Sequence, residues 1–434
     1  MTTTTQIIRE QFLEFFQSRD HMIIPGASLV PSNDPTLLLI NSGMAPIKPY
    51  FTAEAVPISP RLCNVQKCIR TNDIEDVGDR SHLTFFEMLG SWSIGDYFKD
   101  VAVELAGDLL MGKLNIPQSK LYATVYKGND TIGLAYDEES HRAWERLGFK
   151  SNQIVPLGDE DNLWGPAGDT GPCGPCTEVF IDLGDKTGIG SYEETGIFNT
   201  RRYIEIWNAG VFMQLNKNAD GSYAPLPFTS VDTGAGLERL TMAINGNENV
   251  YQEEPYTLLL TQMPSVFSQH ECRVVADHVR AASHLISDGV SPGRNGREYI
   301  TRRLIRRMET IAACHRTKIP YPELLNVVQA KDGRNHEEFK KSDALIREVV
   351  AAEVAVFSRT LSSGLKAFDK VTRKLNGSAE LPSQHAFNIV TAHGFPLEAL
   401  EQIATTRGLR IDRPGVELLM DRHKALSRGA PKPK

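Results

Sequence analysis

The sequence predicts an α+β protein in which an antiparallel sheet flanked by helices is followed by a mostly helical domain. Strand-like runs recur between residues 61 and 232, and Gly, Pro and Asp turns separate most of them. Short connections of this kind favour antiparallel pairing over a doubly wound parallel sheet. From residue 235 onward, apolar residues recur at helical spacing instead. We therefore expect a first domain over residues 1–250 and a helical domain over residues 251–425.

The elements of the first domain follow from periodicity and from turn residues. Apolar side chains at helical spacing predict an amphipathic helix over residues 6–20. Extended segments are expected next, at residues 21–25 and 36–41. Further strands are expected at residues 61–70, 84–89, 121–126, 177–183, 202–214 and 228–232, with helices near residues 97–112 and 138–147.

The second half has a helical pattern. Helices are expected at residues 235–245, 271–287, 297–315 and 337–375, and another begins at Gly394. The basic, Pro-containing end, residues 426–434, is expected to be a disordered tail.

Composition excludes several classes of protein. The chain has 434 residues, 41% of them hydrophobic. No apolar run approaches the roughly 20 residues that a membrane span needs, and the N-terminus lacks the pattern of a signal peptide. We therefore expect a cytoplasmic protein with no membrane partner. A net charge of −7 argues against a general nucleic-acid binder, although a local basic patch could still serve.

The cysteines do not indicate a structural role. Six of them spread over so long a chain are no disulfide framework. Cys173 and Cys176 form a Cys-x-x-Cys pair, but no second such pair or His pair completes a tetrahedral site, so we expect no structural zinc. The segment before them, Gly168-Asp-Thr-Gly-Pro172, has the composition of a loop.

Two arginines stand in contrasting sequence frames. Arg70 closes the strand-like run Arg61-Leu-Cys-Asn-Val-Gln-Lys-Cys-Ile-Arg70, on the polar face that alternation predicts. Arg239 ends Val231-Asp-Thr-Gly-Ala-Gly-Leu-Glu-Arg239, which predicts a strand, two glycines that allow close backbone approach, and the first turn of a helix. Two converging guanidinium groups suit the phosphates of a nucleotide, so the pair suggests ATP held over an antiparallel sheet.

Each of these features also has a plainer interpretation. Arg70 could project into water from a half-exposed edge strand, and Arg239 could pair with Glu238 or another neighbour. Trp164 follows an acidic turn and is either part of a lid or an ordinary core tryptophan. Alternation in residues 204–214 predicts that Glu205 and Trp207 share one face of a strand, and that Asn208, on the other, needs hydrogen-bond partners if buried.

Taken together, these segments resemble the alanyl-tRNA synthetases, a family of class II aminoacyl-tRNA synthetases. The matching segments include Gln66-Lys-Cys-Ile-Arg70 and Trp92-Ser-Ile-Gly-Asp-Tyr-Phe98, and they follow the family's order. They cover residues 36–44, 66–70, 73–78, 84–90, 92–98, 168–178, 205–208, 232–239, 276–281, 302–307 and 394–396.

The resemblance implies ATP-dependent activation of L-alanine on a six-stranded antiparallel sheet. Arg70 on the α-phosphate and Arg239 on the γ-phosphate would be the catalytic residues. ATP would also contact Phe86, which would stack on adenine, together with Met88 and Trp164. Asp232 would bind the alanine ammonium, Trp164 and Asn208 would shape the pocket, and Gly234 would leave room for the substrate. Glu205 would ligate Mg²⁺.

The resemblance also implies contacts with the acceptor stem of tRNA(Ala). They would involve Asn295, which is displaced by about one place from the family's position. The spacing of Arg302, Arg303, Arg306 and Arg307 places these arginines on one helical face, which could follow the phosphates of the tRNA. A solvated basic face is the alternative. The second position at which the family reads the stem falls on Thr391, and the loop after Arg70 is shorter than is usual in the family. We expect neither the family's zinc-bearing editing domain nor its C-terminal dimerising domain, and therefore a monomer.

The leading hypothesis is an alanine–tRNA ligase without an editing domain. The alternative is a paralogue that activates alanine but transfers it to a carrier protein or a small amine. A non-catalytic RNA-binding paralogue is a third possibility, against which Arg70, Asp232 and Arg239 count.

Overall fold

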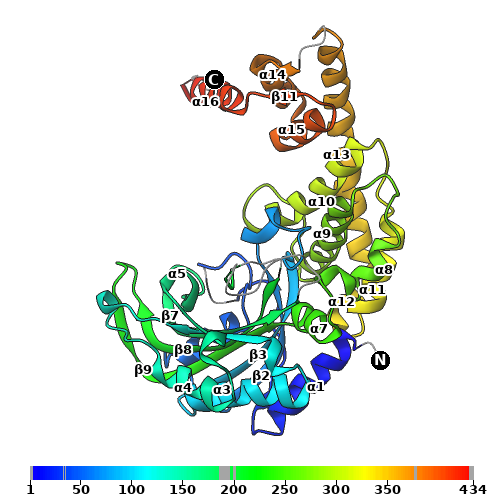
Figure 1. The fold of residues 1–434 in the computed structure, drawn as a ribbon. Helices are drawn as coiled ribbons and strands as arrows, with labels where there is room; N and C mark the ends of the chain where they lie inside the picture. Colours follow the sequence, from blue (N-terminus) through cyan, green and yellow to red (C-terminus); the bar gives the residue numbers. More distant parts are fainter. Residues whose placement is uncertain are drawn as a thin grey trace. The chain divides into compact units, whose positions relative to one another are not determined.

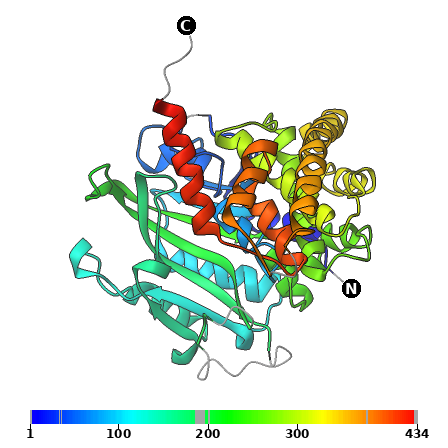
Figure 2. The same ribbon diagram turned by 90° about the horizontal axis from the view of Figure 1, so that it is seen from above.

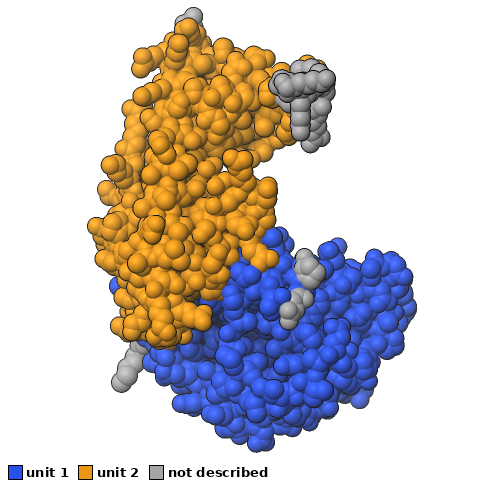
Figure 3. Space-filling model, turned by 180° about the vertical axis from the view of Figure 1, so that it is seen from behind, with its two compact units in different colours: residues 1–258 blue, residues 259–434 orange. Residues whose placement is uncertain are grey.

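The computed structural model describes residues 3–32, 34, 36–184, 196–198, 202–375 and 379–429. The chain divides into two compact units, residues 1–258 and residues 259–434 (Figure 3). The sequence predicts a boundary near residue 250. The separate functions assigned to the two parts of the chain stay predictions.

In the described part of the chain, unit 1 is built on a nine-stranded sheet, which Figure 1 shows as a ribbon. The strands are β1 (Met22–Ile23), β2 (Arg61–Ile69), β3 (Phe85–Ile94), β4 (Leu121–Tyr126), β5 (Ile154–Leu157), β6 (Leu163–Trp164), β7 (Gly171–Asp182), β8 (Tyr203–Lys217) and β9 (Tyr223–Gly236). Their order is β1-β2-β3-β9-β8-β7-β4-β5, and β6 pairs with β7. The long strands β7, β8 and β9 lie side by side in Figure 1, and Figure 2 shows the same sheet from above. The predicted α+β fold class is confirmed.

The pairing of the strands is mostly antiparallel. Neighbouring strands from β2 through β3, β9, β8 and β7 to β4 all run antiparallel. At the two ends of the sheet, β1 pairs parallel with β2, and β5 pairs parallel with β4. The structure therefore contains the six antiparallel strands that the family resemblance implies, and adds the short strands β1, β5 and β6 to them.

The helices of unit 1 pack against the sheet and against one another. They are α1 (Thr5–Gln17), α2 (Lys48–Phe51), α3 (Lys99–Gly107), α4 (Glu138–Arg146), α5 (Asp159–Asn162) and α7 (Leu237–Asn245), and α8 (Tyr256–Leu260) spans the boundary between the units. The residue before helix α1, Thr4, is its N-cap, and the Thr4 hydroxyl accepts a hydrogen bond from the Ile7 amide. Its apolar side chains Phe12 and Phe16 are buried, as the helical periodicity predicts.

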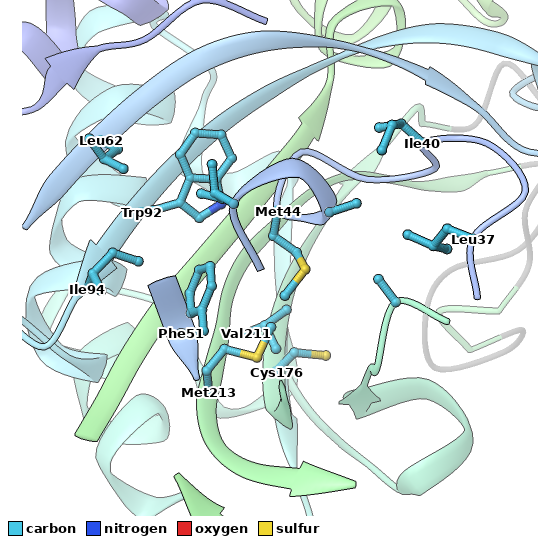
Figure 4. Close-up of a cluster of buried hydrophobic side chains, with 13 residues drawn as sticks. Leu37, Ile40, Met44, Phe51, Leu62, Trp92, Ile94, Cys176, Val211 and Met213 are labelled. Atoms are coloured by element: carbon cyan, nitrogen blue, oxygen red, sulfur yellow. The ribbon is translucent and has the colours of Figure 1, made fainter. Parts of the chain in front are cut away.

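A cluster of buried apolar side chains fills the space beside the sheet (Figure 4). Trp92 of β3 and Val211 of β8 belong to this cluster and are almost completely buried. The other labelled members are Leu37, Ile40, Met44, Phe51, Leu62, Ile94, Cys176 and Met213. Burial of this apolar surface joins the segment after β1 to the long strands.

Two predictions for unit 1 are wrong in detail. Residues 36–41, expected to be extended, form turns and bends and no strand, because Leu37 and Ile40 contribute their side chains to the buried cluster. The backbone is linked to the sheet at Ile40, whose carbonyl accepts a hydrogen bond from the Ile69 amide of β2 at 2.8 Å. Cys173 and Cys176 lie in strand β7, which begins at Gly171 inside the expected loop. There Cys173 is paired with Leu215 and Cys176 with Val211 of β8.

Unit 2 is mostly helical, as predicted (Figure 1). Its helices are α9 (Gln269–Ser287), α10 (Gly296–Cys314), α11 (Tyr321–Asp332), α12 (Glu337–Lys341), α13 (Asp343–Thr372), α14 (Ser383–His393), α15 (Leu397–Thr406) and α16 (Arg413–Gly429). Strands β10 (Glu380–Leu381) and β11 (Arg410–Ile411) form a separate parallel pair. The predicted tail, residues 426–434, is wrong in part, because residues 426–429 form the end of α16; residues 430–434 lie outside the described residues. Among the described residues, no helix is both long and apolar enough to span a bilayer.

Candidate active site

A pocket in unit 1 brings together most of the predicted nucleotide-binding residues. It is lined by Arg70, Asp73, Ser81, Leu83, Phe86, Met88, Glu205, Ile206, Gly234, Gly236, Glu238 and Arg239. These residues come from the end of β2, the segment before β3, the strands β3, β8 and β9, and the first turn of α7. Arg70 and Arg239, the two arginines predicted to bind phosphates, therefore line one cavity.

Arg70 lies against an aromatic ring in this pocket. Its guanidinium carbon is 5.1 Å from the centroid of the Phe86 ring. The contact follows from the strand register, because Phe86 of β3 pairs with Cys68, two residues before Arg70. The Arg70 amide also donates to the carbonyl of Thr84 at 3.0 Å, which holds the end of β2 against β3. Arg70 is half-buried, so it does not simply project into water.

Arg239 is held by an acidic side chain from another strand. Its Nη1 lies 3.1 Å from Oε2 of Glu205 on β8, and its Nε donates to the Ser81 carbonyl at 3.2 Å. The plainer interpretation predicted pairing with Glu238 or a neighbour. The partner is Glu205, whereas Glu238 accepts a hydrogen bond from the Glu87 amide. The ion pair fixes the guanidinium on the pocket wall.

The expected alternation in β8 is wrong at the pocket. Glu205 contacts Arg239, whereas Trp207 packs edge-on against Phe12 and Phe16 of α1. The register between β7 and β8 shifts at this point, because Val179 is opposite Trp207 and Phe180 is opposite Glu205, so that Ile206 has no opposite residue. A bulge of this kind re-aims the side chains that follow it.

Asp232 lies on β9 directly opposite Trp92 of β3. The indole Nε1 of Trp92 donates to Oδ1 of Asp232 at 2.6 Å, and Asp232 is only 6% exposed. Burial raises the pKa of the Asp232 carboxyl to about 7, against the opposing effect of the Trp92 hydrogen bond. Asp232 does not line the pocket itself, but Gly234, two residues along the same strand, does. Alternate residues of a strand share a face, so the carboxyl and the pocket lie on the same side of β9.

Asn208 is the neighbour of Gly234 on strand β8. Its Nδ2 donates to Oε1 of Glu178 at 3.2 Å, and its buried Oδ1 has no hydrogen-bond partner among the described residues. Burial and the nearby charges of Glu205 and Asp161 raise the pKa of the Glu178 carboxyl well above its ordinary value. The motif match over residues 168–178 includes Glu178 but predicts no role for it. Its place after a Cys-x-x-Cys pair in a strand was the available signal.

Gly234 makes room for the side chain of Met88. A Cβ atom at Gly234 would lie 2.7 Å from Sδ of Met88, and that sulfur also accepts a hydrogen bond from the Gly43 amide at 3.1 Å. The predicted purpose of Gly234, room for a substrate, stays a prediction. In the structure the glycine permits Met88 to line the pocket.

Trp164, predicted to contact both ATP and alanine, does not line this pocket. It is part of β6, pairs with Gly174 of β7, and packs half-buried against the apolar cluster of Figure 4. It also lines a second cavity, to which Arg70 and Asn41 contribute. Trp164 therefore combines the contacts of a core tryptophan with a place on a cavity wall next to Arg70.

The comparisons with known proteins agree with this geometry. Residues 7–434 match the family described as tRNA synthetases class II (A). The chain belongs to this family. The resemblance indicated by the sequence motifs is thereby confirmed.

Curated relatives show which members of the class II synthetase family this chain is similar to. It is 39% identical to an alanine–tRNA ligase of Dehalococcoides mccartyi over 437 residues, which is 98% of this chain and 49% of that protein. It is 41% identical to the alanine–tRNA ligase of Treponema denticola over 445 residues, covering 98% of this chain and 73% of that protein. The chain thus spans about half the length of the first of these relatives. An apo histidyl-tRNA synthetase of S. aureus is similar with a TM-score of 0.35 and 16% identity, over 55% of this chain and 65% of that one.

The acidic side chains of the synthetase pocket suit a divalent cation bound together with phosphates. Glu205 lines the pocket, and Glu178 is close enough to both Glu205 and Asp161 to interact with them electrostatically. Among the described residues, no cluster of three or more His, Cys, Asp or Glu side chains could hold a metal ion by itself. Mg²⁺ is commonly bound by one or two carboxylates plus substrate phosphates, so this donor set fits it.

In unit 2, two of the arginines predicted to contact tRNA form ion pairs with a glutamate of a neighbouring helix. Arg302 and Arg306 of α10 both pair with Glu353 of α13, at 3.5 and 2.7 Å, and Glu353 is 7% exposed. Arg306 also lies over the ring of Phe357 at 4.8 Å. These contacts hold α10 against α13. Arg303 and Arg307 on the same helix are half-buried, and Asn295 is the N-cap residue of α10 without a side-chain capping bond.

Proposed function

We propose that this chain activates L-alanine with ATP to form alanyl-adenylate and transfers the alanine to the 3′ end of tRNA(Ala). One observation carries the proposal: Arg70 with Phe86 and Arg239 with Glu205 converge on a single pocket. Strand β9 leads from that pocket to the buried Asp232. The curated relatives support the choice of alanine, because they are named alanine–tRNA ligases.

The activation step needs charge and position rather than a base. A carboxylate oxygen of alanine attacks the α-phosphorus of ATP, an acyl–phosphate bond forms, and the bond to pyrophosphate breaks. The carboxylate is already ionised, so no proton has to be removed. Arg70 would stabilise the charge that develops on the α-phosphate, and Arg239 would hold the γ-phosphate. Met88 and Trp164 would complete the ATP site, in which Phe86 stacks on adenine.

Glu205 would hold Mg²⁺ together with the phosphates, and the ion would neutralise part of the phosphate charge. Because Glu205 already pairs with Arg239, one carboxylate would link the metal to the γ-phosphate arginine. The nearby carboxylates alone would not complete the coordination of Mg²⁺. Phosphate oxygens of bound ATP would supply the remaining ligands.

The alanine site would lie along β9. Asp232 would pair with the ammonium group, while Asn208, Trp164 and Gly234 would limit the size of the side chain that fits. The unpartnered Oδ1 of Asn208 is available to accept a hydrogen bond from the substrate.

Transfer to tRNA would involve unit 2, through Asn295 and the basic face of α10 (Arg302, Arg303, Arg306 and Arg307). Arg302 and Arg306 would act in part through their contact with Glu353, which orients them. We place this reaction in the cytoplasm. The curated relatives favour tRNA over a carrier protein or a small amine as the acceptor.

Two assays test the proposal. Exchange of labelled pyrophosphate into ATP should depend on alanine, and purified tRNA(Ala) should be charged in the presence of ATP and Mg²⁺. Alanine-dependent exchange without charging of any tRNA in total bacterial tRNA would instead support the non-tRNA acceptor. Absence of alanine-dependent exchange would overturn the proposal.

A further inference from the structure

Trp92 makes the one direct hydrogen bond to the buried carboxyl of Asp232 that the described residues provide. The donor is Nε1 of the indole, the acceptor is Oδ1, and the distance is 2.6 Å. The two residues are cross-strand partners on β3 and β9 and are 140 positions apart in the chain. An indole N–H can only donate, and it stays neutral at every accessible pH. It therefore favours the carboxylate over the carboxylic acid.

The indole is held in place by its surroundings. Trp92 is 0% exposed and belongs to the apolar cluster of Figure 4. A Cβ atom at Gly90 would lie 2.4 Å from the Trp92 ring, and one at Gly43 would lie 3.0 Å from it. Two glycines thus leave the space that the ring occupies, and the packed ring has no room to swing away from Asp232.

We propose that Trp92 is a positioning residue that fixes one oxygen of the Asp232 carboxylate and leaves the other for the ammonium group of the amino acid substrate. This inference rests on the proposed function, in which Asp232 binds the alanine ammonium. It adds a residue that is not among the predicted site residues. Asp232 is almost entirely buried, and the second oxygen is then the part of the carboxylate left for a ligand.

Trp92→Phe tests the role, because phenylalanine keeps most of the ring and removes the N–H donor. The matched control is Trp144→Phe. Trp144 is equally buried, and its Nε1 donates at 2.8 Å to a neutral acceptor, the Thr177 hydroxyl. Both variants lose an indole hydrogen bond in unit 1, but only Trp92→Phe removes one from the proposed substrate carboxylate.

Alanine-dependent pyrophosphate exchange should separate the two variants. In Trp92→Phe the KM for alanine should rise about 10- to 100-fold, the loss expected for a hydrogen bond to a charged group, while the KM for ATP stays within about twofold. Loss of the N–H donor should raise the pKa of Asp232, so the fall of kcat/KM for alanine at acid pH should begin at a higher pH than in the wild type. The difference in kcat/KM between Trp92→Phe and the wild type should therefore be smaller at alkaline pH. The inference is overturned if Trp92→Phe matches Trp144→Phe, or if the KM values for alanine and ATP rise together.

A second measurement uses the unaltered chain and does not depend on activity. With ¹⁵N-labelled tryptophan, one indole N–H signal should move downfield as pH rises through about 7, where the pKa of Asp232 lies, and that shift should vanish in Asp232→Asn. If no indole signal titrates with Asp232, the inference fails even when Trp92→Phe does not fold. If the signal titrates but the wild-type chain shows no alanine-dependent exchange, the proposed function fails and the Trp92–Asp232 pair stands.

Discussion

Arg239 and Glu205 form an ion pair across two elements, with 3.1 Å between Nη1 and Oε2. The arginine is in the first turn of α7 and the glutamate is in β8. Each has a predicted ligand of its own, the γ-phosphate for Arg239 and Mg²⁺ for Glu205. The pair therefore holds the two groups at the position where ATP and its metal would meet.

Glu205→Gln should weaken the binding of Mg²⁺ without unfolding the protein. The amide keeps the size of the side chain but loses its charge, so the Mg²⁺ concentration for half-maximal pyrophosphate exchange should rise by about 10-fold or more. Asp96→Asn is the matched control, since Asp96 is also the partner of an arginine, Arg61, at 2.6 Å. An unchanged Mg²⁺ dependence in Glu205→Gln would remove Glu205 from the metal site.

Arg70→Ala should abolish most of the exchange activity. The side chain is expected to stabilise charge on the α-phosphate, and loss of one such group typically lowers kcat by about 100- to 1,000-fold. Arg61→Ala is the control, because Arg61 begins the same strand and makes a partly exposed ion pair with Asp96. Its activity should stay near that of the wild type. Comparable losses in both variants would point to damage of β2 instead of a role in catalysis.

The pH dependence of alanine use should follow the Asp232 carboxyl. Burial raises its pKa to about 7, so below that pH the neutral acid predominates and cannot pair with an ammonium group. kcat/KM for alanine should therefore fall as the pH drops below about 7. Asp232→Asn should lose this limb and about 2 kcal/mol or more of alanine binding. An acid limb that persists in Asp232→Asn would assign it to another group.

Gly234→Ala should impair activity through Met88. The new methyl group would lie 2.7 Å from Sδ of Met88, which would have to leave its position in the pocket. Gly236→Ala is the control, because its Cβ would lie 3.7 Å from the nearest atom, in Arg239, and its φ of −69° suits any residue. We expect Gly234→Ala to raise the KM for ATP or alanine about 10-fold, the effect of some 1.4 kcal/mol, and Gly234→Ala/Met88→Ala to recover part of that loss. Equal effects of the two glycine substitutions would contradict this account.

Asp332→Ala should destabilise unit 2. The carboxylate accepts hydrogen bonds from Nε of Arg280 at 2.8 Å and pairs with Nε2 of His284 at 2.9 Å, all in buried surroundings. Removing one member of a buried ion pair costs about 3–5 kcal/mol. The partly exposed pair of Asp343 and Arg347 is the control, and Asp343→Ala should cost no more than about 1 kcal/mol. Hydrogen exchange in α9 and α11 measures both effects, and equal protection in the two variants would contradict the prediction.

The pKa of Asp332 predicts how its contribution to the stability of unit 2 changes with pH. Burial alone would raise the pKa of Asp332, but the charge of Arg280 and the His284 hydrogen bond outweigh it and hold the pKa well below its ordinary value. The stabilisation is therefore complete above the unfolded value of 3.8 and is lost as the pH falls below it. The difference in stability between Asp332→Ala and the wild type should narrow at acid pH.

Several parts of the site could be predicted because they depend on local sequence. Arg70 directly follows the last residue of β2, one position beyond the predicted place at its end, and Arg239 stands in the first turn of a helix, as expected. Alternation of polar and apolar residues predicts the strand before Arg70. Two glycines followed by a helical pattern predict the position of Arg239. Residues 36–41 were predicted wrongly because a short apolar run is equally consistent with a strand and with an irregular segment packed in the core. The face of Trp207 was predicted wrongly because a bulge interrupts the alternation.

By itself, the sequence determined the fold class, the order of most strands and helices, and the two arginine frames, because periodicity and turn residues act over a few positions along the chain. Only the tertiary structure decided that Glu205 pairs with Arg239, that Trp92 donates to Asp232, and that Met88 fills the space beside Gly234. These contacts depend on which strands become neighbours and on where their register shifts. Residues far apart in the chain meet through that register, which local sequence patterns do not encode.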